Sequence, residues 1–335
     1  MGRVLAAHLH SQGHDVTILS RSGAVAPWRV VSWDGLTIDD WSSALEHADV
    51  LVNLAGRSVN CRYNARNRRA IFESRIRTTR LLGEAIGRLA HPPRLWLNAS
   101  TATIYRHALD RAMDEATGEI GGREPNAPST WRFSIDVATR WEESFFSANS
   151  PGVRKVALRS AIVMSAERGG PFDMLLLLVR LGLGGKSGSG KQFVSWVHEL
   201  DFVRAIDYLI ANEEIEGTVN VASPGPLPNS DFIRILRQTW GTPIGLPVPE
   251  WVLELGAILL RTETELILKS RRVIPSRLLE SGFKFQFTEW SRAAQDLVER
   301  YRLQSARKSG GSRELARMAA DRNAHLKLWH RGEAK

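Results

Sequence analysis

The first 165 residues alternate between two hydrophobic patterns, one typical of amphipathic helices and one typical of short buried strands. Helical spacing of apolar residues predicts helices at residues 1–14, 39–45, 64–89 and 133–148. Short apolar runs bounded by turn-forming residues predict strands at residues 16–21, 30–33, 48–56, 94–100 and 153–164. Strands that alternate with helices in this way are typical of a parallel sheet with helices on both faces. We therefore predict an α/β fold.

Beyond Gly169 the pattern becomes richer in helices and turn residues. An apolar helix ends in a Gly- and Lys-rich stretch at 182–191, and a strand follows at 192–197. A further helix begins near Asp201, which is a candidate N-cap. Prolines separate the remaining helices at positions 224, 226, 228, 243, 247 and 249. We predict that this half of the chain forms a small α-rich C-terminal lobe.

The net charge of +9 is unevenly distributed along the chain. We expect a sheet domain at residues 1–168, the lobe, interleaved with the last sheet elements, at 169–302, and a basic tail at 303–335. From Arg302 onward there are nine Lys/Arg against three Asp/Glu, which accounts for most of the net charge. Nucleic-acid binding needs basic residues interleaved with base-reading or stacking groups on one surface. We interpret the tail as a solvated appendage, with a short docking helix as the alternative, and expect no nucleic-acid partner.

Composition places the chain among ordinary globular proteins, with 43% hydrophobic and 24% charged residues in 335. The single cysteine, Cys61, excludes an internal disulfide framework and fits a reducing compartment. The N-terminus lacks an apolar leader, and the longest apolar run, Met174 to Val179, is far too short to span a bilayer. We therefore expect a cytoplasmic protein without a membrane partner, and the oligomeric state stays open.

The first helix begins where a dinucleotide-binding unit would end its glycine motif. Such a unit needs a strand and then Gly-x-x-Gly-x-x-Gly, so that backbone N–H groups and the helix dipole meet a pyrophosphate. Here Gly2 alone can match the last glycine. We predict a Rossmann-type doubly wound sheet whose first strand is missing, and we expect Met1 to be a mis-called start. A stop codon immediately before Met1, with no in-frame glycines upstream, would contradict that expectation.

The missing strand carries an energetic expectation. In the doubly wound order the first strand is central, so its loss leaves neighbouring strands with unpaired N–H and C=O groups. Each such group costs about 1–3 kcal/mol when buried, against native stabilities of about 5–15 kcal/mol. Several of them would be enough to unfold the domain.

Polar residues at predicted strand ends are the candidate cofactor ligands. Ser20 and Arg21 follow the strand where a Rossmann fold selects its cofactor, and an arginine there favours the 2′-phosphate of NADP over NAD. A strand-end arginine is also a common surface residue. The run Asn53-Leu54-Ala55-Gly56 ends the next buried strand and lets backbone approach a ligand, with a plain tight turn as the alternative.

Two hydroxyls, Ser100 and Thr101, end the following strand. Ligands of open α/β sheets bind in the crevice outside the carboxyl ends of the strands, so either hydroxyl could hydrogen-bond a substrate oxygen. The alternative is a turn-forming hydroxyl.

Other motifs are weaker. Arginines along the helix at 64–89 could bind an anionic substrate, although a charge run is usually a solvated helix face. The stretch from Gly185 to Lys191 resembles a P-loop, but Gln192 replaces the Ser or Thr and a strand follows instead of a helix, so we reject it. His198 is interpreted as a structural hydrogen-bonding residue rather than a base.

Several motifs together resemble the epimerase family proteins, an atypical branch of the extended short-chain dehydrogenase/reductases with a C-terminal helical domain. The resemblance covers about residues 1–298. The motifs that carry it are Leu19-Ser20-Arg21, Asn53-Leu54-Ala55-Gly56, Ser74-Arg75-Ile76-x-x-Thr79, Trp141-Glu142, Gly182-Leu183-Gly184-Gly185, Ser195-Trp196-Val197-His198-x-x-Asp201 and Arg272-Val273-Ile274-Pro275-x-x-Leu278-Leu279-Glu280-x-Gly282-Phe283.

The resemblance implies an NAD(P)-binding Rossmann domain and a lobe that closes over a small-molecule substrate. By its position in the motif, Thr101 would be the active-site hydroxyl. Extended members carry a Tyr-x-x-x-Lys pair that handles the proton. Counting back from Glu142 places Ser134 and Ala138 at those positions, so the pair is absent.

From these observations we expect an NADP-linked oxidoreductase or epimerase, with NAD as a second option for the cofactor. Its substrate is unknown, and a nucleotide-sugar is one candidate. Gly2 would serve the pyrophosphate turn, Ser20 and Arg21 the 2′-phosphate, and the run from Asn53 to Gly56 the ribose side. Ser100 and Thr101 would face the nicotinamide. The alternative, favoured by the absent pair, is a non-catalytic dinucleotide-binding sensor or scaffold protein.

Overall fold

Parallel strands form the centre of the computed structural model, which describes residues 1–23, 26–125, 127–259 and 263–308. The main sheet has the order β3-β4-β5-β9, and every neighbouring pair in it is parallel. Its strands are β3 (Val50–Asn53), β4 (Leu95–Thr101), β5 (Arg154–Ser160) and β9 (Gly217–Val221). The predicted α/β fold with a parallel sheet is confirmed.

The sheet is interrupted next to β3. Strands β1 (Thr17–Ser20) and β2 (Arg29–Ser32) pair in parallel with each other but form a separate two-stranded sheet. Within the described residues, β1 has no strand partner on its other edge, and neither has β3. This break lies where the doubly wound order would place the strand that we predicted to be missing.

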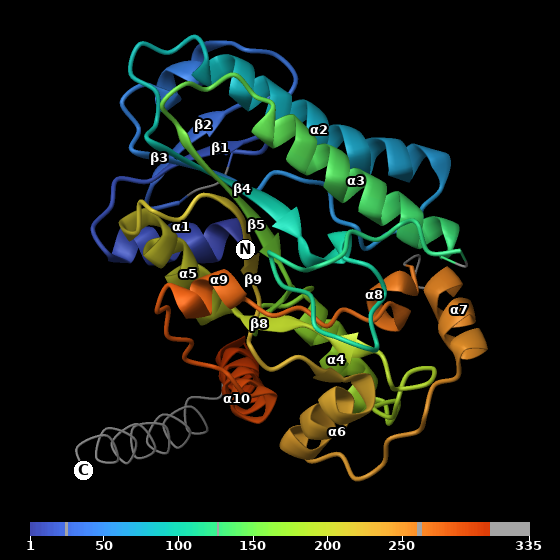
Figure 1. Cartoon of the computed structure of the whole chain (residues 1–335). Coiled ribbons are helices and arrows are strands. Elements are labelled where there is room, and N and C mark those ends of the chain that lie inside the picture. Colours follow the sequence, from blue (N-terminus) through green and yellow to red (C-terminus); the bar gives the residue numbers. More distant parts are fainter. Residues whose placement is uncertain (24–25, 126, 260–262, 309–335) are drawn as a thin grey trace.

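Helices cover both faces of the main sheet (Figure 1). On one face lie α2 (Ala65–Ile86) and α3 (Ser129–Phe146), and on the other lie α1 (Gly2–Ser11) and α5 (Glu199–Ala211). The alternation of side chains along β4 explains this, because successive residues of a strand face opposite sides. Trp96 packs edge-on against Phe145 of α3, with ring centroids 4.8 Å apart, whereas Leu95 and Leu97 join the cluster on the α5 side.

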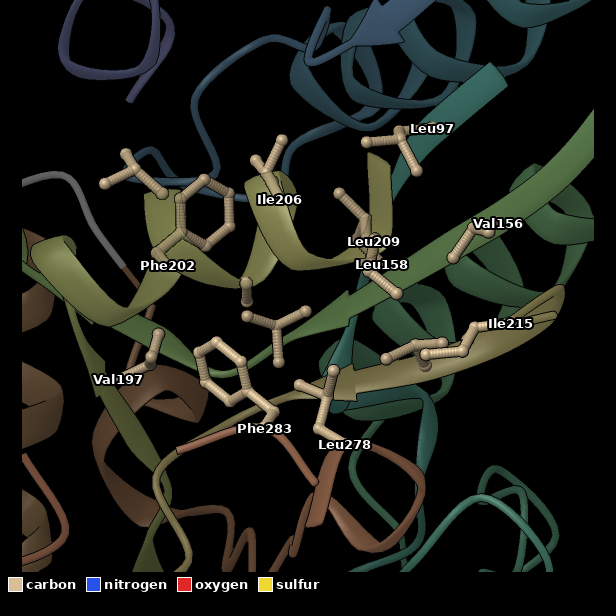
Figure 2. Close-up of a cluster of buried hydrophobic side chains, with 14 of the residues drawn as sticks. Leu97, Val156, Leu158, Val197, Phe202, Ile206, Leu209, Ile215, Leu278 and Phe283 are labelled. Carbon is tan, nitrogen blue, oxygen red and sulfur yellow. The ribbon is translucent and has the colours of Figure 1, made fainter. Parts of the chain in front are cut away.

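A large apolar cluster lies between α5 and the sheet (Figure 2). Phe202, Ile206 and Leu209 of α5 point toward Val156 and Leu158 of β5. All five side chains are buried. The continuous apolar run of β5 is therefore explained by burial on both faces, as expected for a central parallel strand.

The C-terminal lobe is α-rich, as predicted. Its cluster joins side chains of α4 (Pro171–Arg180), α6 (Asn229–Trp240) and α10 (Trp290–Lys308) with Trp196. The remaining elements of this half are the parallel pair β6 (Ile162–Met164) and β8 (Trp196–His198), the antiparallel pair β7 (Phe193–Val194) and β10 (Leu227–Pro228), and the helices α7 (Glu250–Leu259), α8 (Glu265–Leu268) and α9 (Ser276–Glu280).

Three local predictions are wrong. The strand expected at 153–164 is two strands, β5 and β6, which pair in different sheets, and the strand expected at 192–197 is likewise divided between β7 and β8. The third error concerns Asp201, which does not cap its helix. His198 is the N-cap, and its side chain accepts from Leu200 N. The Asp201 carboxylate instead accepts hydrogen bonds from the backbone N–H groups of Gln286 and Phe287.

Short 3₁₀ turns complete the sheet domain: η1 (Asp40–Leu45), where we predicted a helix, and η2 (Ala102–Ile104) directly after β4. Among the residues that the structure describes, no helix combines the length and apolar character needed to cross a bilayer. Most of the basic tail, including the docking helix considered from Ser312 on, lies outside the described residues.

Replacing Leu158 with alanine is expected to lower the free energy of unfolding by about 2–5 kcal/mol, because it removes methyl groups from a fully buried position. Leu181→Ala is the matched control, since Leu181 is 64% exposed and its truncation should change stability by about 0.5 kcal/mol or less. Urea denaturation of both variants measures the difference. Equal losses in the two variants would contradict the assignment of this cluster as the core.

Candidate functional site

The predicted site residues follow the carboxyl ends of three strands. Asn53 ends β3, Thr101 ends the neighbouring β4, and Ser20 ends β1 in the separate sheet. Asn53 lies opposite Asn98 in the parallel register, so the ends of β3 and β4 meet at one edge of the main sheet. Leu19 of β1 packs against the apolar cluster that contains Leu51 of β3.

Asn53 uses its side chain to shape the turn that follows it. Its amide nitrogen donates to Asn98 Oδ1 at 2.7 Å and to Thr79 Oγ1 at 3.3 Å, and its amide oxygen accepts from Ala55 N at 3.0 Å. Trp141 Nε1 also donates to Thr79 Oγ1, at 2.9 Å. The Asn53 side chain is thus satisfied within the protein and engages the Ala55 N–H, so the remaining backbone groups of Leu54, Ala55 and Gly56 are the part of this run that a ligand could contact.

Gly56 lies in close contact with Arg75. A Cβ at position 56 would lie 3.2 Å from Arg75 Cζ, so the Arg75 side chain would have to shift by a few tenths of an ångström. The Arg75 guanidinium lies over the ring of Trp141 at 5.1 Å and donates to the backbone oxygen of Ile71. Burial lowers the pKa of Arg75, and within the described residues no carboxylate pairs with it.

The arginines of α2 were interpreted either as an anion-binding group or as a solvated helix face, and Arg75 differs from most of the others. Most of its arginines are exposed and form a solvated face: Arg66, Arg69, Arg77 and Arg80. Arg75 is partly buried and directed toward the turn at Gly56. The charge run is therefore a solvated face with two partly buried arginines: Arg75, and Arg68, which donates to the backbone oxygen of Tyr63 and lies over the ring of Phe133.

Ser100 and Thr101 differ in what their hydroxyls contact. Ser100 is buried, and its Oγ donates to Glu142 Oε1 at 2.6 Å. Arg159 holds the same carboxylate through two hydrogen bonds of 2.8 and 2.7 Å. Thr101 is half-buried, and its Oγ1 accepts from Thr103 N at the start of η2. Ser100 is thus engaged with helix α3, and Thr101 is the more accessible hydroxyl at the strand end.

Ser134 occupies the position expected for the missing tyrosine, and its hydroxyl contacts a carboxyl group. Ser134 Oγ donates to Glu265 Oε2 at 2.5 Å, so α8 of the C-terminal half reaches helix α3. Glu265 is 1% exposed, and burial raises its pKa. The Tyr63 ring lies near this pair: burial and the charge of Glu265 raise the pKa of Tyr63 to about 12.

Two buried cations beside this pair were not found from the sequence. Lys269 Nζ donates to the backbone oxygen of Thr103 at 2.7 Å, and Arg271 Nε donates to Thr103 Oγ1 at 3.1 Å. They are 1% and 6% exposed. Because more than 160 positions separate them from Thr103, no local pattern indicates these contacts.

An open pocket of about 550 Å³ lies in the loop after η2. Its lining residues are Arg106, Glu119, Ile120, Arg123 and Glu124. Arg106 forms ion pairs with Glu119 and with Asp110, so part of its polar wall is already neutralised within the protein. The pocket is a second place, beyond the strand ends, where a polar ligand can approach the residues that follow β4.

His198 is fully buried in a structural arrangement. Besides capping α5, its Nε2 contacts Asp296 Oδ2 at 3.0 Å, and its ring stacks on Phe287 at 3.9 Å. These contacts support the structural reading of this histidine.

Comparison with known proteins gives matches along most of the chain. Residues 1–222 match the model of the NAD dependent epimerase/dehydratase family, and residues 248–297 match a domain of unknown function, DUF1731. The chain is 32% identical over 304 residues to the epimerase family protein SDR39U1 of Bos taurus, covering 89% of this chain and 96% of the relative. It is 30% identical over 307 residues to the epimerase family protein YfhF of Bacillus subtilis, covering 89% and 94%.

Solved structures agree with these matches. The human epimerase family protein SDR39U1 (isoform 2), crystallised with NADPH, has a TM-score of 0.77 at 28% identity and covers 89% of this chain and 95% of its own. UDP-N-acetylglucosamine 4-epimerase from Bacillus cereus has a TM-score of 0.67 at 16% identity, covering 90% and 95%, and shares the fold. The predicted Rossmann-type fold with a C-terminal helical region is confirmed.

Glu142→Gln is expected to destabilise the protein by about 3–5 kcal/mol, because it leaves the Arg159 charge buried without its partner. Glu143→Gln on the exposed side of the same helix is the matched control, with an expected change of about 0.5 kcal/mol or less. Urea denaturation measures both. A Glu142→Gln variant as stable as the control would show that the pair contributes nothing to this edge of the sheet.

The pH dependence of stability is expected to depend on Lys269, because burial and the nearby charge of Arg271 lower the pKa of Lys269 from 10.5 to about 7. The folded state then binds fewer protons than the unfolded state between these values, so this lysine makes the free energy of unfolding rise with pH from about 7 to 10.5. The charges of Glu265 and Glu124 raise the pKa of Lys269 and so reduce this effect, and the charge of Lys269 in turn lowers the pKa of His107. Lys269→Met removes the rise, as measured by denaturation at a series of pH values. A rise that persists unchanged in the variant would contradict the assignment.

Proposed function

The chain belongs to the NAD dependent epimerase/dehydratase family, as its motifs predicted, and from this premise we propose that it binds NADP and acts on a small-molecule substrate as an oxidoreductase or epimerase. The observation that carries the proposal is the succession of Arg21, the Asn53–Gly56 turn and Thr101 directly after parallel strands. Ligands of open α/β sheets bind at this edge. The NADPH in the crystals of the human relative supports the same cofactor.

Arg21 is the residue proposed to select NADP. It is exposed directly after β1 and, within the described residues, forms no ion pair or hydrogen bond. A guanidinium binds a phosphate through two parallel hydrogen bonds, so a free one at this position suits the 2′-phosphate. Ser20 would line the adenosine ribose beside it.

The pyrophosphate is assigned to the N-terminus of α1. This helix begins at Gly2, and nothing lies within 4 Å of a Cβ built there, so the backbone is open to approach. The first N–H groups of a helix have no partners within the helix and favour an anion. The backbone of Leu54, Ala55 and Gly56 would line the ribose on the nicotinamide side.

Thr101 is the proposed active-site hydroxyl. A bound nicotinamide supplies or accepts the hydride, and the Thr101 Oγ1 would donate a hydrogen bond to the substrate oxygen. Ser100 donates to Glu142 and so holds the end of β4 in place. We propose that it lies near the bound cofactor but makes no catalytic contact of its own. Ser134, hydrogen-bonded to Glu265, replaces the tyrosine of a Tyr-x-x-x-Lys pair. The proposal therefore includes no proton transfer from such a pair.

The proposed domains follow from these assignments: an NAD(P)-binding part at residues 1–168, a substrate lobe at 169–302 and the basic tail at 303–335. A nucleotide-sugar is the proposed substrate class, supported by the shared fold with UDP-N-acetylglucosamine 4-epimerase. The absence of the Tyr-x-x-x-Lys pair favours a second candidate, a non-catalytic dinucleotide-binding sensor or scaffold. Bound NADPH without turnover across a panel of nucleotide-sugars would support the sensor, and a substrate-dependent change in nicotinamide absorbance would support the enzyme.

Arg21→Ala is expected to weaken NADPH binding about tenfold or more and to leave NADH binding unchanged, because it removes a charge-assisted contact that only the 2′-phosphate makes. Arg29→Ala, an exposed arginine of β2, serves as the matched control. Isothermal titration of the 335-residue protein with both nucleotides measures the effect. Equal losses for NADPH and NADH, or none for either, would exclude Arg21 as the selecting residue.

A further inference from the structure

Lys269 is a buried ammonium group without a carboxylate partner. It is 1% exposed, and its hydrogen bond goes to the backbone oxygen of Thr103 at 2.7 Å. Within the described residues, no Asp or Glu oxygen lies within ion-pair distance of Lys269 Nζ. An ammonium has three donors, and a lone carbonyl neither neutralises its charge nor satisfies all of them. A buried charge is normally paired, because desolvation without a partner is costly.

Arg271 adds a second cation with an unsatisfied donor. It is 6% exposed, and its Nη2 has no hydrogen-bond partner. The nearest carboxylate oxygen is Glu265 Oε1 at 3.7 Å, which is likewise without a hydrogen bond. Within the described residues, Glu265 is the one carboxylate within ion-pair distance of either cation, and Glu124 acts on Lys269 from further away. When Lys269 is protonated, Lys269, Arg271 and Glu265 together leave a surplus of one positive charge.

This surplus lies beside the proposed reacting position. The Thr103 that contacts both cations donates its N–H to Thr101 Oγ1. The pKa of Tyr63 responds to Arg271, and Tyr63 also acts on Arg75, the inward-facing arginine at Gly56. The charges of Arg271, from the C-terminal half, and of Arg75, from α2, are thus both coupled electrostatically to Tyr63.

The open pocket of about 550 Å³ is lined by Glu124, whose charge acts on Lys269. The carboxylate of Glu124 accepts hydrogen bonds from the N–H groups of His107 and Gly122, so it is held at the pocket wall. Lys269 itself does not line this pocket.

We propose that Lys269 and Arg271 bind an anionic group of the substrate, a carboxylate or a phosphate, next to the oxygen held by Thr101. The inference deepens the proposed function and rests on it, since it assigns the charge of the molecule that this edge of the sheet receives. The anion neutralises the surplus positive charge and accepts the free N–H groups of both side chains.

The direct test titrates two small anions, sulfate and malonate, into the full 335-residue protein at constant ionic strength, with and without NADPH. The variants are Lys269→Met and the exposed-lysine control Lys284→Met. The wild-type protein and Lys284→Met are expected to bind at least one of the two anions, and Lys269→Met to bind it about tenfold more weakly or worse. A preference for malonate would identify a carboxylate, and a preference for sulfate would identify a phosphate-like group.

Thermal melting separates this role from a merely structural one. Without added anion, Lys269→Met should melt at or above the wild-type temperature, because methionine removes an uncompensated buried charge. The anion should raise the melting temperature of the wild-type protein and leave that of Lys269→Met unchanged. A structural lysine would give the reverse, with a destabilised variant and no dependence on the anion.

Either of two results would overturn the inference. The wild-type protein binds neither anion, or it binds an anion whose affinity is unchanged in Lys269→Met. NADPH affinity is measured in the same series and should be equal in wild type and Lys269→Met. If the wild-type protein does not bind NADPH, the proposed function is contradicted. The anion titration without NADPH would still test the role of Lys269.

Discussion

Glu142 and Arg159 form the buried ion pair on which the functional edge of the sheet depends. The pair joins helix α3 to strand β5, and Ser100 of β4 donates to the same carboxylate. Arg159 also donates to the Tyr105 hydroxyl, which in turn donates to Asn220 of β9. Three neighbouring strands and one helix are therefore fixed relative to one another directly beneath Thr101. A pair of this kind is costly to break, because either charge alone would be buried without compensation.

The sheet is interrupted between β1 and β3. The two parts of the sheet share no strand pairing in the described residues, and what joins them there is apolar packing such as that of Leu19 against the cluster of Leu51. Apolar contacts are not directional, whereas hydrogen-bonded strand pairing fixes register. The residues assigned to the adenosine end of the cofactor thus rest on weaker positional control than Asn53 and Thr101.

The proposed nicotinamide end differs from that of a Tyr-x-x-x-Lys enzyme. Helix α3 supplies Ser134 in place of a phenol, and the neighbouring polar groups come from distant parts of the chain: Tyr63 from the segment before α2, and Glu265, Lys269 and Arg271 from the C-terminal half. Two cations and one carboxylate in a buried environment would give this end a positive character. In the proposed site the C-terminal half would therefore contribute residues as well as cover.

The sequence by itself determined the order of helices and strands, the parallel sheet and the strand ends that carry polar residues. These features follow from hydrophobic periodicity and turn-forming residues, which specify secondary structure within a few positions of the chain. It did not determine where β5 ends and β6 begins, since only pairing partners distinguish one long strand from two. The strand pattern alone did not distinguish the hydroxyls of Ser100 and Thr101, although the family resemblance pointed to Thr101, and the tertiary structure separated them by turning Ser100 toward Glu142. The contacts of Thr103 with Lys269 and Arg271 were decided by the tertiary structure alone. Packing brings together residues more than 160 positions apart, and no local pattern encodes such a contact.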